Sequence, residues 1–416
     1  MTNPYILVIG IGLSVSLFAI MAIYPIGYIQ GFFLLRPVFE SLSEYKIASG
    51  FPVTGLISGL NIVCLFVWLI SGKIKKILVP NFLPLYILIF VGSLSFINSP
   101  SLSISLAHLI RLISWISLGV IVYNAISHRK DVVKVLAAIS YSSIVPMIFG
   151  YYQYFLKRGT IDPVTGPYRA SSVFTVDSWG IFLCFSIFAT LFLYIESKKM
   201  GMRKISMSCI PIFVSLLVSL GLTYHRGSWI ALTLSIILIL LMTRKLKLLL
   251  LFSVIASIIA IGFHDEIINR FSDLFVKRQY GFNSLEARFI LWKSTIALLP
   301  NHFLIGHGLG CGKEILTMSG SLSMVPHNDY LRLLLEVGVL GFLLYFLMLV
   351  GEIFTSFKMF KYKNLRLETS VLLGCLTYFI LISATQNIMY DVINMGLMVS
   401  LLSVMKKRTM LEHSPT

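Results

Sequence analysis

Long apolar segments, separated by short polar or basic connections, recur along nearly the whole chain. A helix that crosses a bilayer needs about 20 mostly apolar residues, so each segment is predicted to span a membrane. Segment 25–36 is short and rich in glycine, and we interpret it as a re-entrant or interfacial piece. The twelve predicted spans are residues 5–24, 51–71, 80–97, 106–126, 131–155, 177–195, 205–223, 228–243, 247–263, 331–357, 368–386 and 390–405.

An even number of spans places both termini on the same side of the membrane. The first segment has no Lys or Arg before it and no evident cleavage site, so we expect it to remain as a span. Two longer connections, residues 157–176 and 264–330, fall on the side opposite the termini, and loops of that length are usually functional. The longer one divides the chain into an N-terminal helical part (1–263), a large outer loop (264–330) and a C-terminal helical part (331–416).

The large outer loop has a pattern of its own. Residues 284–299 have helical periodicity, which predicts an amphipathic helix lying on the outer membrane surface. The following segment, GHGLGCG (306–312), is interpreted as a flexible turn that lets the loop fold back, because it lacks the residues of a phosphate-binding loop. The apolar face of the predicted helix consists of Leu285, Phe289, Trp292 and Ile296.

Composition narrows the class of protein. Hydrophobic residues make up 57% of the 416 residues and charged residues only 12%, against about 25% charged in soluble domains. The mean hydropathy is +0.88. These values exclude a soluble enzyme and predict an all-α integral membrane protein.

The net charge of +17 is explained by topology. If both termini are cytoplasmic, the inner connections and tail hold 20 of the 34 basic residues and five of the 17 acidic ones. The inner balance is then +15 and the outer balance +2. Positive residues collect on the cytoplasmic side of membrane proteins, so no nucleic-acid partner is needed, and the expected partner is membrane lipid.

Cysteine and histidine spacing predicts neither a disulfide framework nor a metal site. The chain has five cysteines, and they form no Cys-x-x-Cys pair. A metal site built from His225, His302 and His307 is possible, but their spacing does not support it. We predict no metal and no cofactor.

His327 is the candidate general base. It precedes a predicted N-cap, Asn328 or Asp329, at the start of a span. The helix dipole and nearby arginines disfavour the imidazolium, so His327 is expected to be neutral and able to accept a proton. The alternative is a hydrogen-bonding loop histidine without a chemical role.

Three arginines on the outer side are not explained by the positive-inside rule. Arg226 lies in YHRGSWI between two spans, Arg288 lies in the predicted loop helix, and Arg169 lies in the shorter outer loop. Guanidinium groups bind phosphate oxygens bidentately, so three converging arginines would form a diphosphate-binding site. The alternative is that each arginine anchors its helix to lipid phosphates.

Four further residues are candidates for supporting roles. Arg111 lies one turn into a predicted span, on the same helical face as His108, and ionisable groups at that depth are functional hypotheses. Arg332 and Glu336 are four residues apart and are predicted to form a structural ion pair. Asn328 is the fourth candidate, as the helix cap beside His327.

These motifs together resemble a known family. RGSW after an apolar span, SLEARFILWKS, G-x-G-x-G and PHNDYLRLLLEVGVLGF at the start of a long apolar helix resemble the signature region of the bacterial O-antigen ligase and polymerase superfamily. The resemblance covers about residues 165–350. The plan of twelve spans with both ends inside is in keeping with it.

The resemblance implies a metal-independent, inverting glycosyltransferase of the membrane-embedded C-type class. Its donor would be a glycan on undecaprenyl diphosphate, bound on the periplasmic face of the bacterial inner membrane. By similarity, Arg226 and Arg288 match the family's diphosphate-binding arginines, Arg169 matches a more variable one, and His327 matches the proposed base.

The acceptor distinguishes members of this family. A polymerase uses a second lipid-linked glycan and a ligase uses lipid A-core; the Leu35, Arg36, Pro37 element and HNDYLRLLLEVG slightly favour a polymerase. A chain-length regulator protein is then a possible partner. A lipid-linked glycan flippase would place ionisable residues near the centres of several spans, and a non-catalytic scaffold would not depend on Arg226, Arg288 or His327.

Overall fold

The computed structural model describes residues 12, 16, 24–40, 53–161, 168–272, 274–276 and 282–413. The predicted span 5–24 lies almost entirely outside these residues. Helices occupy all the predicted spans that follow. They are α3 (Val53–Ile70), α4 (Leu83–Leu94), α5 (Leu102–Ala125), α6 (Arg129–Tyr141), α7 (Ile144–Phe155), α8 (Val176–Lys199), α9 (Arg203–Leu222), α10 (Arg226–Met242), α11 (Leu246–Gly262), α15 (Asp329–Met359), α16 (Arg366–Ser383) and α17 (Val392–His413).

Among the described residues, six helical segments are long and apolar enough to cross a membrane. Together with the composition, they indicate a multi-pass integral membrane protein. The count of twelve spans stays a prediction, because several of the other helices are shorter. The six segments are Leu102–Ala125, Arg129–Phe155, Val176–Lys199, Arg203–Leu222, Asp329–Met359 and Lys363–Ser383.

The predicted span 131–155 is two helices, α6 and α7. Two serines at the junction bond to the preceding turn: Ser142 Oγ donates to the Ile139 carbonyl and Ser143 Oγ to the Ser140 carbonyl, both at 2.7 Å. Pro146 follows and has no N–H to continue the helical ladder. Local hydrogen bonds from side chains to the backbone, which a hydropathy pattern does not reveal, therefore interrupt the helical segment.

Segment 25–36 is part of a regular helix, α2 (Pro25–Glu40), which is longer than the interfacial piece expected from its glycines. It packs against α6 and buries Tyr28 and Ile29 completely. Tyr28 donates to Asn61 Oδ1 of α3 at 2.6 Å. Tertiary packing of one face thus stabilises a helix whose glycines disfavour it in isolation.

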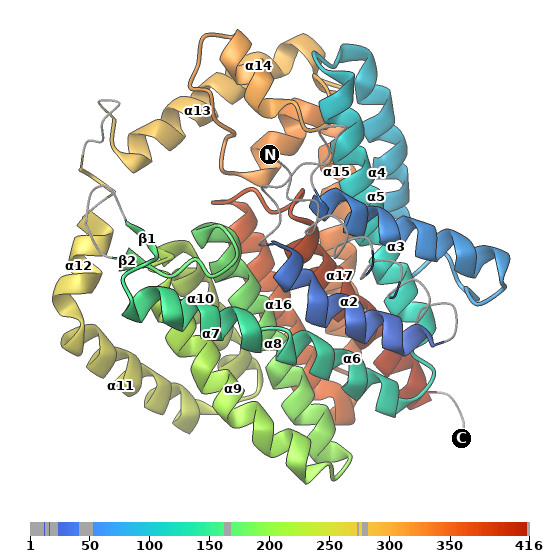
Figure 1. Ribbon diagram of the computed structural model, residues 1–416, viewed down its shortest axis with the longest axis vertical. Coiled ribbons are helices and arrows are strands. Elements are labelled where there is room, and N and C mark those ends of the chain that lie inside the picture. The colour runs from blue at the N-terminus through green and yellow to red at the C-terminus, as the bar shows by residue number, and fades with distance from the viewer. Residues whose placement is uncertain are drawn as a thin grey trace.

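The core lies between α8, α16 and α17 and the helices that pack against them (Figure 1). α8 packs against α6, α9 and α16, while α17 packs against α5, and α10 packs against α16. In the most apolar part of α8, 83% of the residues are buried. A helix buried all round shows no amphipathic stripe, which is why it reads as uniformly apolar.

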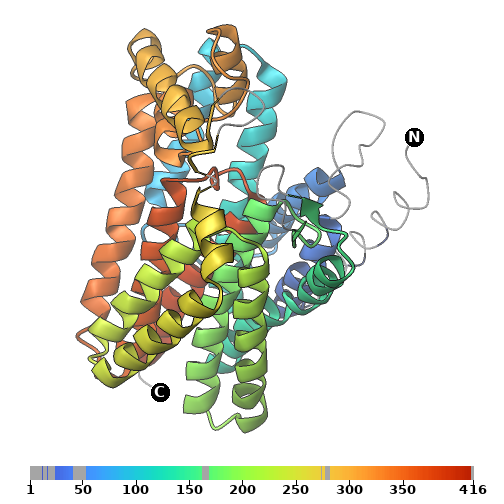
Figure 2. The same cartoon turned by 90° about the vertical axis from the view of Figure 1, so that its left-hand side faces the viewer.

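Helices α13 (Ser284–Leu298) and α14 (Gly312–Met318) lie at one end of the bundle, and the α8–α9 connection lies at the opposite end (Figure 2). Basic residues near that opposite end are partly held in ion pairs. Arg408 Nε lies 2.8 Å from Glu196 Oε1, and Arg129 Nη2 lies 3.1 Å from Glu196 Oε2. Some of the basic residues that the positive-inside rule explains therefore also form ion pairs, and these ion pairs connect α6, α8 and α17.

The large loop contains α12 (His264–Ser272), α13, η2 (Leu299–His302) and α14. The side chain of Asn283 caps α13 by accepting from the backbone N–H groups of Leu285 and Glu286. The side of α13 that packs on the protein contains Leu291 and Thr295, not the predicted apolar face. On that predicted face, Phe289 and Ile296 are exposed. Contact between this face and the membrane stays a prediction.

Candidate active site

A cavity of about 440 Å³ lies next to the loop helices α12 and α13. It is surrounded by the starts of α8 and α10, the end of α16, the residues just before α15, and the loop helices α12 and α13. Arg169, Arg226, Arg288 and His327 all line it. The fold thus brings together four residues that are up to 158 positions apart in the sequence.

The arginines reach the cavity from separate elements. Arg169 ends a two-residue strand, β2 (Tyr168–Arg169), which pairs with β1 (Thr160–Ile161). Its Nε donates to the Thr223 carbonyl at 3.0 Å. Arg226 is the first residue of α10, and its Nη1 donates to the Arg270 carbonyl at 2.6 Å. Arg288 lies in the second turn of α13. These bonds to the backbone hold Arg169 and Arg226 at the cavity wall.

Arg270 is a fourth arginine at the cavity, and it is not among the residues predicted from the sequence. It lies in the last turns of α12, is only 5% exposed, and donates from Nε to the Tyr224 carbonyl at 2.8 Å. No signal in the sequence distinguishes Arg270, because an arginine is ordinary in a short polar helix. Four guanidinium groups and the carboxylate of Asp177 therefore line one cavity.

His327 has the properties expected of a base. Burial, followed by the positive charge of Arg288, holds the pKa of His327 below its ordinary value of 6.5, so the ring is neutral at pH 7. Its Nδ1 is buried and has no hydrogen-bond partner among the described residues. The backbone of His327 is left-handed, with φ of 50°, a conformation that non-glycine residues rarely adopt and that clusters at functional sites.

His225 also lines the cavity, but its ring is already engaged. Nδ1 lies 2.7 Å from Ser228 Oγ, and Nε2 lies 3.0 Å from Gln386 Nε2 and 3.4 Å from Asp177 Oδ1. The side chain is nearly completely buried, which lowers the pKa of His225 to about 4. His327 is therefore the better candidate to exchange a proton with a ligand.

The four supporting candidates do not line the cavity. Asn328 caps α15, as predicted, by accepting from the N–H groups of Tyr330 and Leu331. Arg332 and Glu336 form the predicted ion pair, with Nε and Oε1 2.7 Å apart. Arg111 and His108 share a face of α5, with Nη1 and Nε2 3.5 Å apart.

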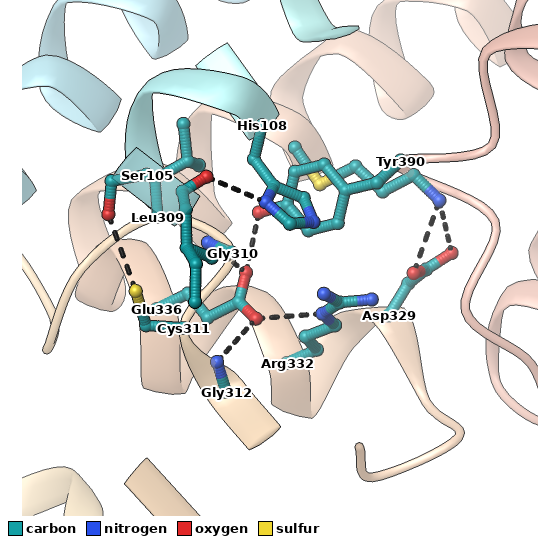
Figure 3. A network of polar contacts seen from close by, with 12 residues as sticks. Ser105, His108, Leu309, Gly310, Cys311, Gly312, Asp329, Arg332, Glu336 and Tyr390 are labelled. Carbon is teal, nitrogen blue, oxygen red and sulfur yellow. Dashed lines mark hydrogen bonds and ion pairs between the residues drawn. The ribbon is translucent and has the colours of Figure 1, made fainter. Parts of the chain in front are cut away.

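Glu336 is the centre of a buried network beside the cavity (Figure 3). Besides Arg332, its carboxylate accepts from the N–H groups of Gly310 at 2.9 Å and Gly312 at 3.0 Å, and from the hydroxyl of Tyr390 at 2.6 Å. The side chain is completely buried. Burying a charge is costly unless it is paired and hydrogen-bonded, and here both conditions are met.

The glycine-rich segment 306–312 is a close-packed connection, and its interpretation as a flexible turn was wrong. Gly308 has φ of 121°, and an added Cβ would lie 2.7 Å from the Ser99 backbone. Gly310 has φ of 79°, and its Cβ would overlap the ring of His108. The glycines are needed because the backbone must approach α5 and α15 closely.

α15 is kinked at Gly338, where the backbone is non-helical, with φ of 70°. The glycine-rich segment compensates for the interruption, since His307 N–H and Gly308 N–H donate to the Leu335 and Glu336 carbonyls. On the other side of the kink, Val339 N–H donates to the Phe303 carbonyl at 2.9 Å. The loop therefore supplies the hydrogen bonds that the broken helix lacks.

The five cysteines are all buried and free. The rings of His302 and His307 pack edge to face, with centroids 4.6 Å apart. In the part of the chain that the structure describes, no three His, Cys, Asp or Glu side chains are grouped so that they could hold a metal ion.

Fold and site define a multi-pass membrane protein whose arginine-lined cavity opens at one end of its helices. Residues 211–346 match the family described as O-antigen ligase. This match supports the O-antigen ligase and polymerase superfamily for that part of the chain. The matched residues include Arg226, Arg270, Arg288 and His327, whereas Arg169 lies outside them. No curated protein matches the chain.

Proposed function

We propose that the protein is a glycosyltransferase that moves a glycan from undecaprenyl diphosphate to the hydroxyl group of an acceptor sugar. The observation that supports this most is the convergence of four arginines and one neutral histidine on a single cavity. Arginines suit a diphosphate, and a neutral histidine suits deprotonation of a hydroxyl. The family match supports a role in polysaccharide biosynthesis with lipid-linked glycans.

The proposed reaction is a direct displacement. The acceptor oxygen attacks the anomeric carbon, the bond from that carbon to the diphosphate oxygen breaks, and the hydroxyl proton passes to His327. Arg169, Arg226, Arg270 and Arg288 stabilise the charge that develops on the departing diphosphate. Attack opposite the leaving group inverts the anomeric configuration. In this mechanism, arginines supply the charge stabilisation, and neither a metal nor a cofactor takes part.

Apolar side chains line the remaining part of the cavity, and we assign this part to the first isoprene units of the donor. A lipid-linked diphosphate requires a charged region next to an apolar one, and this cavity contains both. The apolar residues include Ile230, Phe271, Leu274, Phe282, Leu322 and Met324.

The proposed location is the bacterial inner membrane, with both termini cytoplasmic and the cavity facing the periplasm. The basic connection Lys198 to Lys204 lies at the end of the bundle opposite α13, in agreement with the positive-inside rule. The helices that end at the cavity would carry the diphosphate near the outer membrane surface. Membrane lipids are then the surroundings of the chain and the source of its donor.

We propose a repeat-unit polymerase as the activity, with a lipid-linked glycan as acceptor and a chain-length regulator as a possible partner. The element Leu35, Arg36, Pro37 is the observation that favours it, and its Arg36 forms an ion pair with Glu40 at 2.7 Å. The second candidate is a ligase that uses lipid A-core, which the description of the matched family favours. A flippase is less suitable, because the ionisable groups of the cavity are at one end of the helices.

The experiment is transfer by the purified protein in nanodiscs, supplied with a lipid-linked repeat unit as donor. Formation of longer lipid-linked chains would identify a polymerase. When lipid A-core is supplied as acceptor, transfer of the glycan to it would identify a ligase. Normal transfer by a folded His327→Ala variant would contradict the mechanism. Absence of any transfer by the wild type, with lipid movement between leaflets instead, would favour the flippase.

A further inference from the structure

Besides the arginines and His327, the cavity is lined by polar side chains that the proposed mechanism does not use. Asp177 lies in the first turn of α8, and Thr385 and Gln386 follow the end of α16. Carboxylate, hydroxyl and amide groups can all hydrogen-bond with the hydroxyls of a sugar. The apolar side chains assigned to the lipid come mostly from the loop that contains α12 and α13, so different elements supply the two kinds of lining.

Asp177 differs from its polar neighbours because it carries a negative charge. Among the described residues that line the cavity it is the single carboxylic acid, in the company of Arg169, Arg226, Arg270 and Arg288. A carboxylate repels a diphosphate and so weakens the binding that the arginines favour. Its presence in the cavity therefore indicates a role other than binding the diphosphate.

The protein leaves much of the Asp177 carboxylate unbonded. Its Oδ1 lies 3.4 Å from His225 Nε2, which is long for a hydrogen bond, and the described residues provide no shorter one. The same ring nitrogen already lies 3.0 Å from Gln386 Nε2. The side chain of Asp177 is 48% exposed, and an ionised carboxylate has about four acceptor sites. Most of its hydrogen-bonding capacity is thus available to a ligand.

The backbone that carries Asp177 is held on both sides. Thr175 caps α8 by accepting from the N–H of Ser178. Ser178 Oγ donates to Asp391 Oδ2 at 2.6 Å, and Asn394 Nδ2 donates to the Ser178 carbonyl at 3.2 Å. An acidic residue in a first turn also favours the helix dipole, but the cap of α8 is already supplied by Thr175. The first turn is therefore a fixed support that presents a carboxylate to the cavity.

The geometry of a direct displacement favours the acceptor sugar as the partner of this carboxylate. The acceptor attacks from the side opposite the diphosphate, whereas the first sugar of the donor is joined to the diphosphate itself. Repulsion between two negative groups falls with distance, so a carboxylate is tolerated best on the acceptor side. Its two oxygens can accept from two neighbouring hydroxyls of one ring, which makes the interaction sensitive to their arrangement.

We propose that Asp177 is a specificity-determining residue that binds the acceptor sugar by accepting hydrogen bonds from two of its neighbouring hydroxyl groups. This inference rests on the proposed function. The site takes a neutral sugar at this position, and it disfavours an acidic sugar because two carboxylates would repel each other. The arginines and His327 keep the roles that the mechanism gives them.

The test is steady-state transfer in nanodiscs, with a lipid-linked repeat unit as donor and the octyl glycoside of the repeat unit, which has no diphosphate, as acceptor. Asp177→Asn keeps the shape of the side chain and removes its charge. The acceptor KM should rise about 10 to 100-fold, because hydrogen bonds to charged groups are the stronger ones. At saturating acceptor, kcat should stay within about threefold of the wild type.

The same variant should bind the donor no more weakly than the wild type, because a charge that repels the diphosphate is removed. The donor KM and the inhibition constant of inorganic pyrophosphate are the measurements, and neither should rise. Asp265→Asn in α12 is the matched control, since the Asp265 side chain is 90% exposed and does not line the cavity. It removes the same charge and should leave all these constants unchanged.

Octyl glycosides that each lack one hydroxyl test the bond directly. In the wild type, removal of a hydroxyl that Asp177 binds should raise the acceptor KM by about tenfold or more, and Asp177→Asn should no longer distinguish that glycoside from the parent compound. A wild type whose acceptor KM depends on no single hydroxyl would overturn the inference without any variant. KM does not depend on the fraction of folded protein, so partial misfolding of a variant leaves the comparison valid.

Three results with Asp177→Asn would each overturn the inference: an acceptor KM within about threefold of the wild type, a higher donor KM, or a large loss of kcat at saturating acceptor. The last result would mean that Asp177 takes part in the chemical step. His327→Ala in the same assay tests the proposed function separately. If that variant transfers normally, the function itself fails, whereas an inactive His327→Ala beside an unchanged acceptor KM in Asp177→Asn removes only the role of Asp177.

Discussion

The cavity and the Glu336 network are neighbouring groups of charged side chains with opposite character. In the network, Glu336 is surrounded by donors from Gly310, Gly312, Arg332 and Tyr390, and no solvent reaches it. In the cavity, four arginines, Asp177 and His327 line an open space. Polar groups whose hydrogen bonds are all made within the protein stabilise a fold, whereas polar groups that line an open space can bind a ligand and react with it.

The segment between α16 and α17 joins the two groups. Gln386 lines the cavity and contacts His225, Ile388 and Met389 bond with Asp329, and Tyr390 bonds with Glu336. A rigid network can therefore keep the cavity in position. The comparison predicts that substitutions in the cavity change rate more than stability, and that substitutions in the network do the reverse.

The largest effect is expected for His327→Ala. Loss of a general base lowers kcat by about 10²–10⁴-fold, and the free energy of unfolding should change little because His327 lies at the wall of an open cavity. Transfer assays measure kcat, and denaturant unfolding in detergent measures the free energy of unfolding. His302→Ala, in the exposed part of the same loop, is the control and should keep the wild-type rate. Strong destabilisation of the His327→Ala variant would contradict the expectation that substitutions in the cavity change rate more than stability.

Glu336→Ala should lower the free energy of unfolding by about 3–5 kcal/mol, because the buried Arg332 guanidinium loses its carboxylate. Chemical denaturation followed by tryptophan fluorescence would measure this loss. The fraction that still folds is expected to keep a kcat close to the wild type. If instead stability is unchanged and kcat falls, the network belongs to the active site.

Arg288→Ala should lower kcat/KM by about 10²–10³-fold, since one group that stabilises the leaving diphosphate is removed. Arg288→Lys keeps the charge but not the planar pair of donors, and should recover only part of the loss. Steady-state transfer kinetics would show both. Arg158→Ala is the matched control, because Arg158 bonds with Tyr152 outside the cavity. Equal losses in the two Ala variants would contradict a specific role.

Gly310→Ala should cost about 1–3 kcal/mol of stability, because its Cβ would overlap the His108 ring. Gly320→Ala separates this overlap from backbone strain, since Gly320 has a similar φ of 76° but no atom within 4 Å of an added Cβ. Thermal unfolding of the two variants provides the measurement. We expect Gly310→Ala to be the less stable of the two, and the opposite order would mean that 306–312 is loosely packed.

The smallest effect is expected in the pH profile of the wild type. The reaction needs neutral His327, and burial together with Arg288 lowers the pKa of this group below 6.5. Activity is therefore retained as pH falls through 6.5 and is lost only below it. Arg288→Ala removes one cause of the lowered pKa, so the acid limb of that variant should move to higher pH. A wild-type limb above pH 6.5 would exclude His327 as the titrating base in the cavity.

Much of the candidate site was predictable from residue type and position. His327, Arg169, Arg226 and Arg288 attract attention because ionisable residues on the outer side of an apolar chain need a separate explanation. Arg270 and Gln386 could not be identified in this way. Arg270 lies in a polar helix where an arginine is ordinary, and Gln386 is an uncharged residue at the end of an apolar span.

By itself, the sequence determined the class of protein, the approximate positions of most helices and the short-range interactions. Apolar length, the Asn328 cap and the pair Arg332–Glu336 depend on neighbours within one or two turns, so they can be recognised from a linear pattern. Only the tertiary structure decided that the glycine-rich segment packs closely, that α13 turns Leu291 inward, and that Gln386 contacts His225. Those outcomes depend on contacts between residues far apart in the chain, and no local pattern contains the distances between them.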